Sequence, residues 1–76
     1  MLIAKDVVNK PEILDKIKDT YEIINDSTNT GTLNNLNKAL NIMAKKGWKC
    51  VGISTVAQPG SLTGYKIEAY AVMEKQ

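Results

Sequence analysis

Few side chains in this 76-residue chain have the chemistry of a catalytic or metal site. There is no histidine and a single cysteine, Cys50, so neither a histidine general acid nor a cysteine cluster for zinc can form. Cys50 is the one soft nucleophile, but no activating base accompanies it in the sequence, and we expect a small side chain on a strand. We therefore expect a protein that is not an enzyme, with no catalytic residue, no metal site and no cofactor.

The acidic residues show one pair at helical spacing. Asp15 and Asp19 lie four residues apart on a predicted helix, with Lys16 and Lys18 beside them. Such a mixture of charges is typical of a solvated helix face, and this interpretation is favoured over a metal site.

Two groups of polar residues are candidates for ligand binding. Lys66, Glu68 and Tyr70 alternate along a strand-like run and so share one face, where they could bind a polar ligand or simply form a half-exposed strand edge. The segment TNTGT, residues 28–32, leads into a predicted helix, where free backbone amides can hold an anion beside Thr30 and Thr32. It lacks the phosphate-loop pattern, and capping of the helix by Thr32 needs no ligand.

Length and composition predict one domain over residues 1–76. The net charge is only +2 and all ten cationic residues are lysine, so the planar fork with which arginine recognises phosphate and guanine is missing. A nucleic-acid partner is therefore disfavoured. The opening MLIAKDVV is too short for a signal peptide and no run is long enough to span a membrane, so we expect a cytoplasmic protein.

Helical spacing appears twice. Apolar residues recur from Ile13 to Ile17 after a proline suited to a first turn, which predicts a helix over about 10–19, while residues 2–8 fit a strand or a helix. Residues 33–46 carry the clearer pattern, with an apolar stripe of Leu33, Leu36, Leu40, Met43 and Ala44. Gly47 stands where a left-handed residue ends a helix.

Two strand-like runs follow, at residues 48–57 and 65–75, and an antiparallel hairpin is the natural interpretation. Their connection, QPGSLTG at 58–64, is long for a hairpin and fits a ligand lid or a plain longer loop. With a strict period of two, the helix stripe covers only one face of these strands. The opposite face is also apolar, which is typical of an interaction surface, and we predict an interface of Trp48, Cys50, Val56, Tyr70 and Val72, covered by the N-terminal helix or by another subunit.

The segments YEIIND, LNKALNIMAKKGWKCVGIS and YKIEAYAVMEK, within residues 21–75, resemble the family of short proteins catalogued as domain of unknown function 4177. The resemblance implies a strand, a helix ending in a glycine–tryptophan joint, and two antiparallel strands, so residues 20–25 are expected to be a strand. Residues 1–19 depart from the family pattern, which implies an N-terminal extension over 1–19 and a core over 20–76. It implies no catalytic residue. The predicted fold is α+β: a small antiparallel sheet of about three strands in β-α-β-β order, packed on an amphipathic helix, with an N-terminal helical extension.

Small size and a second apolar face favour a self-associating or protein-interaction module without catalytic activity, most simply a homo-oligomer. The alternative is a small-ligand binding or sequestering protein, which would hold a polar or anionic metabolite at a subunit interface or in a loop cleft. No membrane partner is expected.

Overall fold

The structure is a computed structural model that describes residues 1–30, 32–59 and 65–76. In chain order the elements are β1 (Leu2–Ile3), α1 (Ala4–Asn9), the 3₁₀ helix η1 (Pro11–Lys16), β2 (Tyr21–Thr28), α2 (Asn34–Lys45), β3 (Trp48–Pro59) and β4 (Tyr65–Lys75). The fold is α+β with the predicted β-α-β-β core. Residues 60–64 of the predicted hairpin connection lie outside the described residues.

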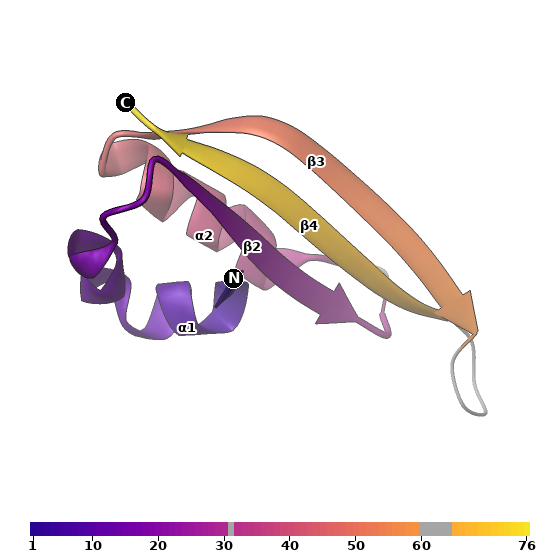
Figure 1. Ribbon diagram of the computed structural model, residues 1–76. Helices are drawn as coiled ribbons and strands as arrows, with labels where there is room; N and C mark the ends of the chain where they lie inside the picture. The colour runs from indigo at the N-terminus through magenta and orange to yellow at the C-terminus, as the bar shows by residue number, and fades with distance from the viewer. Residues whose placement is uncertain (31, 60–64) are drawn as a thin grey trace.

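The sheet has four strands rather than the predicted three, in the order β1-β2-β4-β3. Strand β4 is central and antiparallel to both β2 and β3, whereas β1 pairs with β2 in parallel. The helices lie on one side of the sheet (Figure 1). We call the side of the sheet that carries the helices the inner face and the opposite side the outer face.

The N-terminal segment differs from the predicted helix over 10–19. Residues 2–3 join the sheet as β1, and the helix α1 lies earlier, at Ala4–Asn9. Lys10 precedes Pro11, and a proline disfavours helical dihedrals in the residue before it. Lys10 accordingly has φ −144° and ψ 70°, which ends α1 and separates it from η1.

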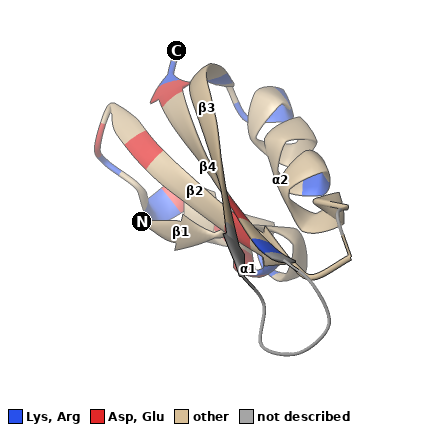
Figure 2. Cartoon of the chain, turned by 90° about the vertical axis from the view of Figure 1, so that its right-hand side faces the viewer, with Lys and Arg blue, Asp and Glu red and all other residues tan. Residues whose placement is uncertain are grey.

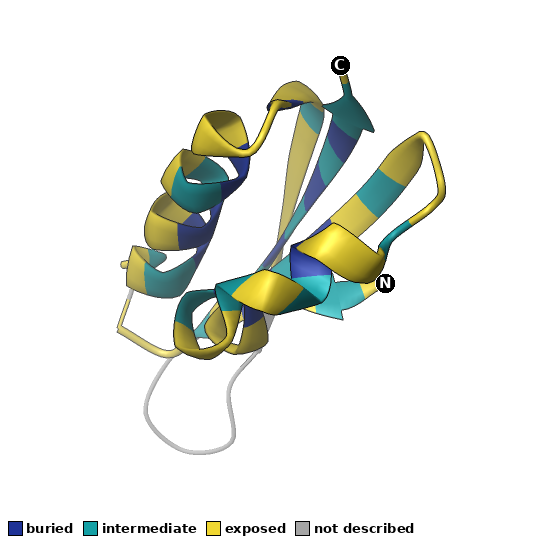
Figure 3. Cartoon of the chain, turned by 90° about the vertical axis from the view of Figure 1, so that its left-hand side faces the viewer, coloured by how far each residue is buried: buried dark blue, intermediate teal, exposed yellow. Residues whose placement is uncertain are grey.

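Helix α2 follows the predicted pattern, but its buried face is rotated slightly about the helix axis relative to the predicted stripe. Leu36, Ala39 and Met43 are buried, while Ala44, which was predicted to belong to the stripe, is exposed. The surfaces of α1 and α2 that face away from the sheet are largely exposed (Figure 3). Gly47 has φ +90° and so ends the helix in the left-handed conformation that was predicted for it.

Strand β3 contains a bulge that changes which side chains share a face. Its register against β4 shifts between Cys50 and Gly52. An extra residue at a bulge breaks the alternation of side chains. Trp48 therefore lies on the inner face, opposite Lys75, rather than on the outer face where strict alternation put it. Only 4% of Trp48 is exposed.

Trp48 is covered by its own chain. The amino group of Lys75 lies 5.2 Å from the centroid of the indole ring and donates a hydrogen bond to the carbonyl of Ile17, just after η1. The backbone amide of Lys75 donates to Thr20 at 2.8 Å. These contacts tie the N-terminal segment to the end of the sheet, where Trp48 belongs to the buried core of Ala4, Val7, Leu14, Ile24, Leu36, Ala39, Met43, Trp48, Ala69, Ala71 and Met73.

Candidate functional site

The outer face is the candidate functional surface because the helices cover only the inner face (Figure 1). Strand pairing arranges its side chains in rows across β2, β4 and β3. These rows are Tyr21–Glu74–Lys49, Ile23–Val72–Gly52, Asn25–Tyr70–Ser54 and Ser27–Glu68–Val56. Three of the five predicted interface residues, Val56, Tyr70 and Val72, therefore lie together on one face.

Several large apolar side chains of the outer face are open to solvent. The exposed fractions are 43% for Ile23, 45% for Val56 and 56% for Tyr21. Strand β1 adds Ile3, which pairs with Asn25 and is 42% exposed. Val72 lies between Ile23 and Gly52 and is half-buried. Gly52, the partner of Val72 on β3, has no side chain with which to cover it.

Two predicted interface residues do not belong to this surface. Trp48 is buried in the core on the inner face, as described above. Cys50 is exposed, but its register opposite the buried Met73 also assigns it to the inner face. The Cys50 thiol donates a hydrogen bond to the carbonyl of Gly52 across the bulge, at 3.4 Å. The bulge is the physical reason for both corrections.

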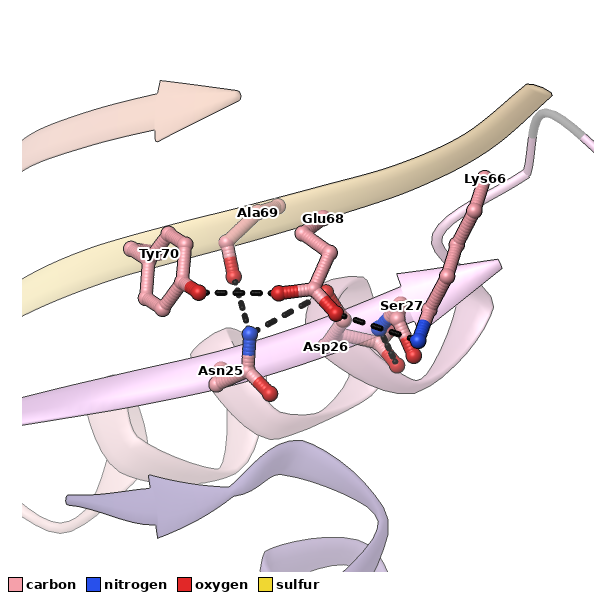
Figure 4. A network of polar contacts seen from close by, with 7 residues as sticks. All are labelled: Asn25, Asp26, Ser27, Lys66, Glu68, Ala69 and Tyr70. Carbon is pink, nitrogen blue, oxygen red and sulfur yellow. Dashed lines mark hydrogen bonds and ion pairs between the residues drawn. The ribbon is translucent and has the colours of Figure 1, made fainter. Parts of the chain in front are cut away.

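A polar cluster occupies one end of the outer face. The Tyr70 hydroxyl donates to Oε2 of Glu68 at 2.8 Å, and Nζ of Lys66 lies 3.3 Å from Oε1 of the same carboxylate (Figure 4). Beside them, the side-chain amide of Asn25 donates to the carbonyl of Ala69 at 3.2 Å. Lys66, Glu68 and Tyr70 are thus brought together as their spacing predicted, and both carboxylate oxygens are already engaged.

The contacts within this cluster shift its proton affinities. Hydrogen bonds from Tyr70 and then from Lys66 lower the pKa of Glu68, since both favour the carboxylate. The same hydrogen bond, together with the negative charge of Glu68, raises the pKa of the Tyr70 hydroxyl. At neutral pH the cluster is therefore a carboxylate held between an ammonium and a neutral phenol.

Thr30 and Thr32 form a separate group. Their hydroxyls lie 3.0 Å apart, and the Thr30 hydroxyl lies 2.9 Å from that of Thr28, all exposed. Among the described residues, no hydrogen bond or ion pair joins them to Lys66, Glu68 or Tyr70. Thr30 and Thr32 therefore remain a candidate separate from the polar cluster, as their positions in the sequence suggested.

The predicted cap of α2 by Thr32 is wrong. The N-cap residue is Leu33, and it provides no side-chain hydrogen bond. The backbone amide of Leu36 in the first turn is bound instead by the carboxylate of Asp26, which belongs to β2. The start of α2 is thus already occupied by an acidic side chain of the protein.

The other chemistry-bearing side chains do not assemble into a site. In residues 1–30, 32–59 and 65–76, no group of three or more His, Cys, Asp or Glu residues could hold a metal ion. Asp15 forms an exposed ion pair with Lys46 at 3.0 Å. This contact explains one of the two spaced aspartates without a metal.

Three apolar residues of the outer face were not predicted as site residues: Ile3, Tyr21 and Ile23. A usable signal exists for two of them, because Tyr21, Ile23 and Asn25 alternate along β2 with the buried Ile24 and Asp26 between them. Ile3 had no such signal, because β1 has only two residues and shows no alternation.

Comparison with known proteins adds no family or relative. No family model matches the chain, and neither a curated protein nor a solved structure matches it. The resemblance to domain of unknown function 4177 therefore stays a prediction. Within the described part of the chain, no helix is long and apolar enough to cross a membrane.

Proposed function

We propose that this protein is a small self-associating module without catalytic activity, and that a second copy covers the apolar part of the outer face. The observation that carries the proposal is the exposure of Ile3, Tyr21, Ile23 and Val56 on one side of one sheet. An exposed apolar patch is typical of an interaction site, and Tyr21, Ile23 and Val72 lie in adjacent rows of this face. The free, exposed thiol of Cys50 fits a reducing compartment, and we propose the cytoplasm as the location.

Ligand binding at the polar cluster is less favoured by the geometry. Both oxygens of the Glu68 carboxylate already have partners, Tyr70 and Lys66. A polar ligand would have to displace these contacts before it could bind the carboxylate. Apolar surface at Ile23 and Val56 has no such internal competitor, and burying it is favourable by roughly 25 cal/mol per Å².

The outer-face proposal is tested by substitution of Ile23 with lysine. Ile23 lies on β2, one strand in from the short edge strand β1, and faces solvent, so Ile23→Lys places a charge on the proposed contact while sparing the core. Ala44→Lys on the exposed side of α2 is the matched control, since it also replaces an apolar residue with lysine. We expect Ile23→Lys to lower the mass measured by light scattering on a gel-filtration column, and Ala44→Lys to leave it unchanged. Equal masses for wild type and Ile23→Lys, both that of one chain, would contradict the proposal.

A further inference from the structure

The long edge of the sheet, β3, has few of the features that keep an edge strand unpaired. Natural edges are protected by charged side chains, prolines, bulges or shortness. In β3 such features stand only near the two ends: Lys49 and the bulge at Cys50/Gly52 at one end, and Pro59 at the other. Residues 52–58 carry no charge and no proline, and β3 lacks charged residues along most of its length (Figure 2).

The same strand presents large apolar side chains to solvent on both of its faces. Val51, Ile53 and Val56 are 48%, 59% and 45% exposed. Ile53 lies on the inner face opposite Ala71, and Val56 lies on the outer face opposite Glu68. Among the strands that the structure describes, none neighbours β3 on its other side. The edge therefore offers both backbone hydrogen-bonding groups and apolar side chains.

We infer that two copies of this chain pair antiparallel through residues 52–58 of β3, so that their two sheets become one continuous sheet. This inference goes beyond the proposed function, because it names a second contact between copies, at the edge of the sheet, that leaves both outer faces uncovered. A two-fold axis perpendicular to the sheet keeps the inner faces of both copies on the same side. Residues that lie opposite each other across the axis must then belong to the same face.

The strand is complementary to itself in such a pairing. With the axis at Ser54, Val56 of one copy lies opposite Gly52 of the other on the outer face, and Ile53 lies opposite Thr55 on the inner face. A Cβ placed on Gly52 meets no atom within 4 Å, so there is open space for the valine. Ile53 and Thr55 are both β-branched, and branched side chains pack well against their neighbours on a pleated sheet.

Charge does not oppose the pairing. Lys49 is the one charged residue of β3. In the pair centred on Ser54, the two Lys49 residues lie at opposite ends, ten residues apart along the paired strands. At ~3.3 Å per residue this is roughly 33 Å, several times the Debye length at physiological salt.

The area of the outer face also favours a second copy at this edge. Three strands about 4.8 Å apart and, for the eight residues of β2, about 27 Å long present on the order of 400 Å². A standard stable interface buries ~800 Å² on each partner. One outer face alone is smaller than this, whereas pairing through β3 joins two outer faces into one surface of about that size, which a further pair of copies can cover.

Amide hydrogen exchange followed by NMR tests the pairing on the unmodified protein. In a single chain, every second amide of β3 points to solvent, so exchange across residues 53–57 alternates between slow and fast. In the paired protein we expect slow exchange at all of these positions. Thr55→Lys, which adds a charge to the exposed inner side of the edge, is expected to restore the alternation.

A cysteine cross-link gives the matched structural test. Cys50→Ser with Ser54→Cys places two thiols opposite each other at the axis, and we expect a disulfide-linked dimer on oxidation. Cys50→Ser with Asn41→Cys on the exposed side of α2 is the control and should not cross-link. Alternating exchange in the wild type, with no cross-link above the control, would overturn the inference. If the edge pairing is overturned but Ile23→Lys still lowers the mass, only the outer-face proposal stands. If the Ser54→Cys cross-link forms equally well with Ile23→Lys, and Ile23→Lys does not change the mass, only the edge pairing stands.

Discussion

The carboxylate of Asp26 on β2 accepts a hydrogen bond from the backbone amide of Leu36 in the first turn of α2, at 2.8 Å. Its other oxygen accepts from the amide of Ser27 at 2.9 Å, and the side chain is buried. The first amides of a helix have no partner within the helix, and a carboxylate there satisfies one of them and matches the helix dipole. A residue of the sheet thus positions the helix that covers the sheet.

Asp26→Ala is expected to destabilise the protein by about 1 to 2 kcal/mol, because a first-turn amide of α2 loses its partner. The measurement is the free energy of unfolding from urea titration. Thr32→Ala is the control and should have little effect, since Thr32 does not cap the helix. The opposite ranking of these two variants would show that Asp26 is not the cap.

The indole of Trp48 is expected to report its burial directly. Native protein should fluoresce at shorter wavelength than unfolded protein even at the lowest concentration that can be measured, because the chain itself covers the ring. Trp48→Ala should cost about 3 to 5 kcal/mol, the usual range for truncating a large buried aromatic residue. Lys38→Ala on the exposed side of α2 is the control, with an expected change within about 0.5 kcal/mol. Emission at the wavelength of a solvated indole in dilute native protein would contradict the structure.

Gly47 and Gly52 make a matched pair of glycines. Gly47 has φ +90°, where a side chain costs roughly 1 to 2 kcal/mol, so Gly47→Ala should destabilise the protein by about that amount. Gly52 has open space around it and does not have a positive φ, so Gly52→Ala should leave the stability of the chain nearly unchanged. Thermal unfolding of both variants measures the difference. Equal losses for the two would contradict this assignment of roles.

Local signals made α2, its end at Gly47 and the β3–β4 hairpin predictable. The helical periodicity of residues 33–46 and the alternation of residues 65–75 are clear, and the structure follows both with little change. The errors come from features that depend on tertiary contacts. Strand β1 is too short to show a pattern, the cap of α2 comes from Asp26 on a distant strand, and the bulge has no pattern of its own.

For the candidate site too, the correct predictions rest on local patterns and the errors on tertiary features. Val56, Tyr70 and Val72 share a face because they lie on regular strand segments, beyond the bulge in β3 and along β4. Trp48 was misplaced because the bulge stands between it and the rest of β3, which reverses the alternation.

The polar cluster predicts that the stability of the protein depends on pH, with a sign that follows from the pKa shifts of Glu68 and Tyr70. Glu68 has a lowered pKa, so its contribution to stability is present above the ordinary pKa of a glutamate and is lost as the pH falls through the lowered value. Tyr70 has a raised pKa, so its contribution is present below the ordinary pKa of a tyrosine and is lost as the pH rises through the raised value.

Carbon-13 NMR titration of the Glu68 carboxylate checks this cluster. Tyr70→Phe should raise the pKa of Glu68 toward that of a free glutamate, because the largest stabilising contact of the carboxylate is removed. Tyr21→Phe is the control: the Tyr21 hydroxyl donates to Glu74 instead, at 2.8 Å, and its removal should leave Glu68 unchanged. An ordinary pKa for Glu68 in the wild type would contradict the geometry of the cluster.

Self-association is tested most directly by sedimentation velocity of the wild-type protein over a series of concentrations. If the exposed apolar outer face is covered by a second copy, the sedimentation coefficient will rise with concentration to that of a species of at least two chains. A sedimentation coefficient that stays at the value of a single 8.4 kDa chain throughout the series would contradict the proposal.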